Sequence, residues 1–119
     1  AIITRVTLSL SEGRTPREIK ESMQAYLERR RMAQPLEFPS LGSIYKRPQT
    51  GYAAELIERA GLKNASVGGA AVSGKHTGFI INTGGATAKD ILDLIKHVQK
   101  VVFEKYGVNL ETEVRVLGE

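Results

Sequence analysis

The feature that most constrains the fold is a long amphipathic segment between Thr87 and Gly107. Its apolar side chains recur at intervals of three and four residues, which places them on one face of a helix: Ile91, Leu94, Ile95, Val98 and Val102. Thr87 and Asp90 have the spacing of a helix N-terminus, and Gly107 is a typical terminator. We therefore predict a helix over 87–106, with one face buried against a second layer of structure.

The segments around this helix predict the second layer. Gly78–Asn82 is an apolar run typical of a buried strand, and Leu110–Val116 alternates apolar and polar residues like a strand with one buried face. Val67–Ser73 is a small-residue strand or loop, and Tyr52–Arg59 is a short helix stopped by Gly61. The expected fold class is α+β: a two-layer domain with a small, mainly antiparallel sheet covered by helices, in which the strands 78–82 and 110–116 share one sheet.

The first third of the chain predicts a strand followed by a helix. Ala1–Leu10 alternates like a strand already in progress. Thr15 and Glu18 then have the spacing of a capping box, and Pro16 occupies the first helical position, so we expect a helix to about Arg31.

Composition excludes several classes of protein and leaves others open. The 119 residues fit one domain, and 17 Lys and Arg against 13 Asp and Glu give a formal charge of +4, which suits anionic small molecules as well as nucleic acid. The absence of cysteine excludes disulfides and thiolate chemistry, and with only two histidines we expect no metal site. No apolar run approaches the roughly 18 residues of a membrane span. We therefore expect a cytoplasmic protein with no membrane partner.

One glycine-rich segment resembles a phosphate-binding loop but fails on two counts. Gly69–Lys75 matches the pattern G-x-x-x-x-G-K, yet the next residue is His76 instead of the Ser or Thr that reaches magnesium. Such a loop must also open a helix, whereas the following segment is predicted to be a strand. The pattern therefore does not indicate a nucleoside triphosphatase.

A serine in a glycine-flanked, cationic run is the first candidate for chemistry. Ser43 lies between Gly42, which allows a close backbone approach, and an extended segment ending at Pro48. Lys46 and Arg47 in this run could hold a phosphate or a carboxylate. A plain surface loop that enters a short strand explains the same residues.

The second candidate is a carboxylate in the last predicted strand. Alternation sends Glu111, Glu113 and Arg115 to the face opposite Val114 and Val116. If the apolar face is core, these polar side chains face either solvent or a cleft. Both readings stay open on the pattern alone.

Four ordered segments resemble the C-terminal, substrate-binding domain of the UDP-N-acetylenolpyruvoylglucosamine reductase family. They are 34–39 running into 42–48, then 55–63, 68–82 and 110–115. Their short connections, without an extra tyrosine-bearing loop, are similar to the compact branch of that family. Leu41 and Gly74 depart from the usual family pattern.

This resemblance implies a domain division, an activity and partners. Residues 15–119 correspond to the C-terminal substrate-binding domain, and residues 1–14 to the end of the preceding flavin-domain sheet or a linking strand. The full-length family enzyme uses FAD and NADPH to make UDP-N-acetylmuramate for peptidoglycan. Its partners are a UDP-sugar substrate and the N-terminal flavin-binding domain, which holds the flavin contacts and a catalytic arginine. We therefore expect no cofactor on this chain alone, and no activity.

The resemblance also assigns roles to individual residues. Ser43 matches the family's proton donor, and Glu113 matches its catalytic glutamate, which stabilises negative charge on the substrate. Three further residues match positions that contact substrate in the family, namely Arg47, Lys63 and His76, and Gln34 is an additional candidate for substrate binding.

Two other classes of protein remain as alternatives. A small nucleic-acid-binding module would need a basic face interleaved with exposed aromatic residues, and the chain has only 4 Tyr and 3 Phe. A structural interaction domain fits the composition but gives no reason for Ser43 and Glu113 to stand in their motifs.

Overall fold

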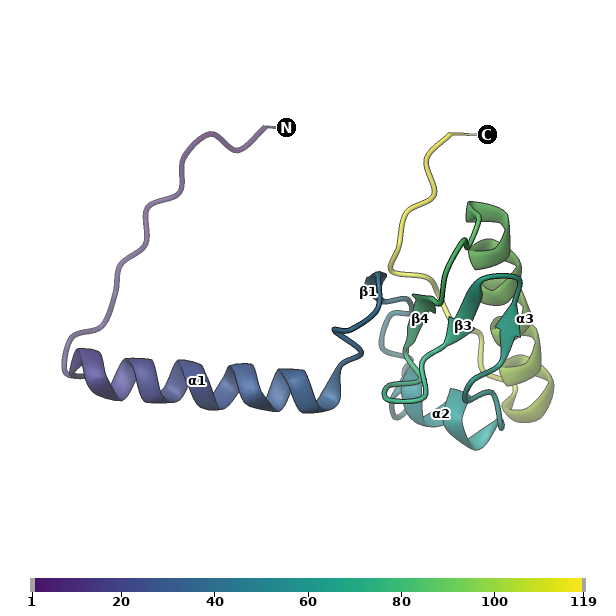
Figure 1. The fold of residues 1–119 in the computed structure, drawn as a ribbon, viewed down its shortest axis with the longest axis horizontal. Coiled ribbons are helices and arrows are strands. Elements are labelled where there is room, and N and C mark those ends of the chain that lie inside the picture. The colour runs from purple at the N-terminus through teal and green to yellow at the C-terminus, as the bar shows by residue number, and fades with distance from the viewer. Residues whose placement is uncertain (1, 119) are drawn as a thin grey trace. The chain divides into compact units, whose positions relative to one another are not determined.

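The computed structural model describes residues 2–118, and the chain divides into two compact units between Met32 and Ala33 (Figure 1). The first unit contains most of helix α1 (Pro16–Ala33). The second unit contains the sheet and the two remaining helices.

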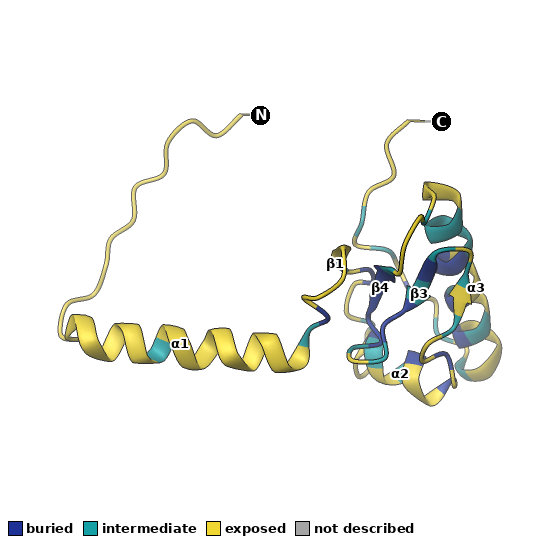
Figure 2. Ribbon diagram, viewed as in Figure 1, coloured by how far each residue is buried: buried dark blue, intermediate teal, exposed yellow. Residues whose placement is uncertain are grey.

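Helix α1 begins where the capping residues predict. The Glu18 carboxylate accepts a hydrogen bond from the Thr15 backbone N–H at 2.7 Å, and the Thr15 hydroxyl accepts one from the Glu18 N–H at 3.3 Å. The Thr15 backbone hydrogen bond lowers the pKa of Glu18. No residue of α1 is buried, so its apolar side chains at Ile19, Met23 and Tyr26 are exposed (Figure 2).

The predicted N-terminal strand is wrong over residues 2–10, and Ala1 lies outside the described residues. Residues 2–14 have no regular secondary structure, and Ile2, Val6 and Leu8 are exposed. Alternation alone does not form a strand, because a strand must exchange backbone hydrogen bonds with a neighbour. The described residues offer this segment no partner strand.

The second unit is a two-layer α+β domain, which confirms the predicted fold class. Its four strands are β1 (Ser40–Ser43), β2 (Ser66–Val67), β3 (Ala70–Val72) and β4 (Phe79–Asn82). They form an antiparallel sheet in the order β1-β4-β3-β2, with Ala71 opposite Ile81 in the central pair. Helix α3 (Ala88–Tyr106) packs against β2 and β3, and the short helix α2 (Ala53–Arg59) packs beside α3.

The core lies between the sheet and the apolar face of α3. Leu94 and Val98 have no exposed surface, and Val72 of β3 is 1% exposed. Of the five predicted core residues on this helix, four are buried and Ile91 packs against the core half-buried. Figure 2 shows this buried band on β3, β4 and α3. Removing this apolar surface from water is the main force that holds the two layers together.

The last segment of the chain corrects one detail of the predicted sheet. Leu110–Val116 does not form a strand, and its one ladder contact among the described residues is a bridge between Tyr45 and Thr112. Both edges of β4 are already paired, with β1 and β3. The segment meets only the continuation of β1, and the prediction that 110–116 is a strand in the same sheet as 78–82 is wrong.

Helix α3 is closed at both ends by the residues that the sequence indicates. The Asp90 carboxylate accepts the Thr87 N–H at 2.9 Å, and the Thr87 hydroxyl accepts the Asp90 N–H at 3.1 Å. The hydrogen bond from the Thr87 backbone to its carboxylate is the largest of the causes that lower the pKa of Asp90. Gly107 ends the helix in the left-handed conformation, with φ 67°, where a side chain would be strained.

The Asp90 cap gives the domain an acid-sensitive contribution to stability. Because the folded-state pKa is below the ordinary value of 3.8, the contribution is present above that value and is lost as pH falls through the folded pKa. We expect the melting temperature of the wild-type chain to exceed that of Asp90→Ala at pH 6, and the difference to shrink as the pH falls below about 4. Circular dichroism melts would measure it, with Glu104→Ala on the same helix as a control. A difference that stayed constant with pH would contradict the cap's role.

Candidate functional site

Ser43 lies at the end of β1, on the rim of the domain. The next two residues, Ile44 and Tyr45, are only 1% and 3% exposed, whereas Ser43 itself is exposed. The Ile44 N–H donates to the Gly78 carbonyl at 2.9 Å, which fixes this turn of chain against the start of β4. The fold thus presents the Ser43 hydroxyl at the surface from a rigidly anchored backbone.

The segment that carries Glu113 lies directly beside the segment that carries Ser43. The Glu113 N–H donates to the Ile44 carbonyl at 2.8 Å, and the Lys46 N–H donates to the Glu111 carbonyl at 2.9 Å. The Lys46 ammonium also forms an ion pair with the Glu111 carboxylate at 2.9 Å. The structure therefore brings the hydroxyl-bearing and carboxylate-bearing segments together from positions far apart in the sequence.

Tyr45 anchors this pair of segments to the core. Its hydroxyl donates to the Ile95 carbonyl of α3 at 3.2 Å. Burial raises the pKa of the Tyr45 hydroxyl above its ordinary value, so it remains a donor at neutral pH. Tyr45 is thus a structural anchor two residues from Ser43.

Lys63 and His76 line one hollow of about 300 Å³, together with residues of α2. The Lys63 ammonium contacts the Glu58 carboxylate at 3.2 Å, and both side chains are about half exposed. His76 reaches this hollow from the loop between β3 and β4. The structure therefore brings these two predicted binding residues together.

Arg47 lies next to the same hollow, because its guanidinium contacts Tyr52. Its guanidinium lies 4.3 Å from the centre of the Tyr52 ring, and Tyr52 also lines the hollow that holds Lys63 and His76. Tyr52 is the N-cap residue of α2, its side chain makes no capping bond, and it is 58% exposed, so its ring is available to Arg47.

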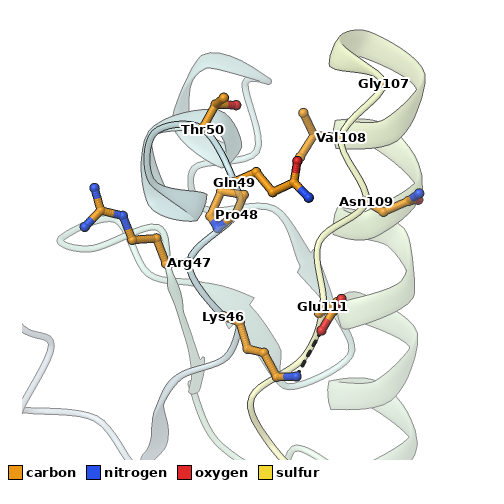
Figure 3. Close-up of a pocket in the computed structure, with 9 residues that line it drawn as sticks. All are labelled: Lys46, Arg47, Pro48, Gln49, Thr50, Gly107, Val108, Asn109 and Glu111. Atoms are coloured by element: carbon orange, nitrogen blue, oxygen red, sulfur yellow. Dashed lines mark hydrogen bonds and ion pairs between the residues drawn. The ribbon is translucent and has the colours of Figure 1, made fainter.

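A second hollow, of about 440 Å³, lies between residues 46–50 and 107–111 (Figure 3). Figure 3 shows Lys46 turned toward Glu111, and the Arg47 side chain directed away from that pair. Arg47 therefore lines this second hollow, while its guanidinium lies over Tyr52, which lines the first.

Gln34 is the one predicted binding residue that the structure does not place with the others. It is half-buried at the start of the second unit, where its carbonyl accepts the Leu36 N–H at 2.9 Å. It is not among the residues that line either hollow described above.

The cationic side chains of Arg47 and Lys63 suit an anionic ligand. Arg47 and Lys63 offer a planar fork and a point charge, the two forms in which proteins bind phosphate and carboxylate oxygens. Within residues 2–118, no group of three or more metal-binding side chains converges, and no helix is long and apolar enough to cross a membrane.

The structure defines an α+β domain in which the segments that carry Ser43 and Glu113 are hydrogen-bonded to each other, and in which cationic side chains line two nearby hollows. The family model for "UDP-N-acetylenolpyruvoylglucosamine reductase, C-terminal domain" matches residues 34–117. The chain belongs to this family.

Relatives and a solved structure agree with the family model. The chain is 53% identical over 118 residues to UDP-N-acetylenolpyruvoylglucosamine reductase of Caldanaerobacter subterraneus, and 51% identical over 117 residues to that of Clostridium perfringens strain SM101. These matches span 99% and 98% of the chain but only 39% and 38% of the relatives. The crystal structure of the Thermus caldophilus enzyme covers 83% of this chain and 35% of its own, with a TM-score of 0.66 and 39% identity. These comparisons give no support to the nucleic-acid alternative.

Proposed function

We propose that this chain is the substrate-binding and proton-donating part of a reductase that converts UDP-N-acetylglucosamine enolpyruvate to UDP-N-acetylmuramate for peptidoglycan. The observation that carries the proposal is the pairing of the Ser43 and Glu113 segments through the Glu113 N–H and the Ile44 carbonyl, at 2.8 Å, within the region that matches the family. The proposal includes a cytoplasmic location, where nucleotide-linked sugars and NADPH are available.

In this proposal, FAD in the N-terminal part of the enzyme, once reduced by NADPH, would supply a hydride to the terminal carbon of the enolpyruvyl group. Ser43 then donates a proton to the carbon next to the substrate carboxyl group. A serine hydroxyl is a feeble acid in water, but it can protonate a strongly basic carbon held within about 3 Å. Glu113 stabilises the charge that develops on the substrate.

In this proposal, the hollow lined by Lys63 and His76 binds the diphosphate and the carboxylate of the substrate. Arg47, Lys63 and His76 supply the donors in this proposal, and Gln34 is a further contact. None of these residues is assigned to the flavin. We expect the isolated chain neither to bind FAD nor to turn over NADPH, because the N-terminal flavin-binding domain supplies those functions. In the same proposal, residues 1–14 belong to the sheet of that domain or link to it.

Substitution of the cations tests the proposal. In a full-length reductase carrying this C-terminal sequence, Arg47→Ala and Lys63→Ala should each raise the KM for the UDP-sugar about 10- to 100-fold, because each removes a charged hydrogen bond. Turnover at saturation should change little, since these groups hold the substrate equally in the ground and transition states. Steady-state kinetics would measure both constants.

A matched control for Lys63 is Lys100→Ala, because Lys100 is also an exposed lysine that contacts a carboxylate, that of Glu104. Its KM should stay at the wild-type value. If all three variants shared the wild-type KM, the assignment of the substrate to this hollow would be wrong.

A further inference from the structure

The loop between β3 and β4 is closed by a buried hydroxyl. Ser73 is 1% exposed, and its Oγ accepts the N–H groups of Lys75 at 3.1 Å and of His76 at 3.2 Å. The Ser73 N–H donates to the Phe79 carbonyl at 2.9 Å, which closes the base of the loop. A buried hydroxyl with these bonds restricts the backbone of His76 to one conformation.

The His76 ring has a fitted position within this loop. Its Nδ1 accepts the Gly78 N–H at 3.1 Å, and its ring meets the edge of the Phe79 ring with centres 4.8 Å apart. A Cβ atom on Gly78 would lie 3.0 Å from His76 Cε1, closer than ordinary contacts allow. A side chain at residue 78 would therefore push the ring a few tenths of an ångström from this position.

These contacts select one tautomer of the imidazole. A ring whose Nδ1 accepts a hydrogen bond carries its proton on Nε2 when it is neutral. His76 lines the hollow that it shares with Lys63, so the Nε2–H is the group that can donate to a ligand there. The same loop is tied to α2, because the Thr77 hydroxyl donates to the Ala54 carbonyl at 2.5 Å.

We propose that Ser73 and Gly78 are positioning residues that hold His76 as an Nε2–H donor toward an acceptor oxygen of the bound UDP-sugar. The proposal rests on the proposed function for its ligand, but the geometry of the ring is independent of it. Lys63 supplies charge in this hollow, and His76 supplies a directed hydrogen bond.

The first test uses the wild-type 119-residue chain without ligand. Nitrogen-15 spectra of the histidine rings at pH 8, with His97→Gln to assign the two rings, should show His76 with its proton on Nε2. The amides of Lys75 and His76 should exchange slowly with solvent, although Lys75 is an exposed residue. A ring with its proton on Nδ1, or fast exchange of both amides, would overturn the proposal.

The second test measures binding of UDP-N-acetylenolpyruvoylglucosamine to the same chain by calorimetry. Ser73→Ala and Gly78→Ala should each weaken binding roughly two- to tenfold, the range for one lost hydrogen bond. Neither change should weaken binding further in a His76→Ala background, because both act through that ring. Ser73→Thr, which keeps the hydroxyl, should recover affinity. Ser66→Ala, an exposed serine in β2, is the control.

The two tests separate failure of this proposal from failure of the proposed function. If the wild-type chain does not bind the UDP-sugar, the proposed function loses its support, and the ring spectra decide the positioning claim. Ser73→Ala should then still move part of the His76 population to the other tautomer. Unchanged spectra in Ser73→Ala, or weakening that simply adds to that of His76→Ala, would refute the proposal.

Discussion

Replacing Ser43 with alanine should slow the reoxidation of reduced flavin by the enolpyruvyl substrate about 10²- to 10⁴-fold, in a full-length reductase carrying this C-terminal sequence. This is the usual contribution of a general acid. Reduction of the flavin by NADPH should stay near the wild-type rate, because that half-reaction does not use the serine. Substrate affinity should change little, since the hydroxyl acts mainly in the transition state. Stopped-flow absorbance of the flavin would follow each half-reaction separately.

Two further variants sharpen this prediction. Ser43→Cys should recover part of the rate, because a thiol can also donate a proton. Ser40→Ala, at the other end of β1, is the matched control, and it should leave both half-reactions at the wild-type rate. Equal slowing of both half-reactions by Ser43→Ala, or no slowing of either, would show that Ser43 is not the acid.

Replacing Leu94 with alanine should lower the free energy of unfolding of the second unit by about 2–5 kcal/mol. Leu94 has no exposed surface and belongs to the central cluster between α3 and the sheet. The substitution removes buried apolar surface and leaves a cavity that tightly packed neighbours fill only in part. Urea unfolding, followed by circular dichroism, would measure the change in midpoint.

Leu117→Ala is the matched control, because Leu117 is 90% exposed. Its free energy of unfolding should stay within about 0.5 kcal/mol of the wild-type value. If Leu94→Ala were as mild as Leu117→Ala, the packing of α3 described above would be wrong.

Helices were predictable because their signals are local. The capping boxes at Thr15 and Thr87 and the left-handed terminator Gly107 lie within a few residues of the turns they control. The apolar period of α3 likewise predicts which of its faces is buried, and the structure confirms this at Leu94 and Val98.

Strands were less predictable because a strand depends on a partner that the local pattern does not name. The alternation in 2–10 and in 110–116 is similar, yet neither segment forms a strand among the described residues. Conversely, β1 lies just after Pro39 in a stretch with no clear alternation, and it forms because the edge of β4 is available to pair with it.

In the candidate site too, individual residues could be predicted from local motifs, but their contacts with distant segments could not. Ser43 and Glu113 were named through motifs, but the hydrogen bond that places Glu113 beside Ile44 joins distant segments and could not be read from either one. Tyr52 and Ser73 were missed because their importance lies in contacts with Arg47 and His76 in the folded chain.

A crystal structure of a full-length reductase carrying this sequence, with UDP-N-acetylenolpyruvoylglucosamine bound, would show directly whether Ser43 is the proton donor. We expect the Ser43 Oγ to lie about 3–3.5 Å from the carbon that receives the proton, the distance expected of reacting groups. We also expect the diphosphate to lie in the hollow lined by Lys63 and His76, within reach of Arg47. A nucleotide sugar bound elsewhere, or a Ser43 hydroxyl turned away from the enolpyruvyl group, would contradict these roles.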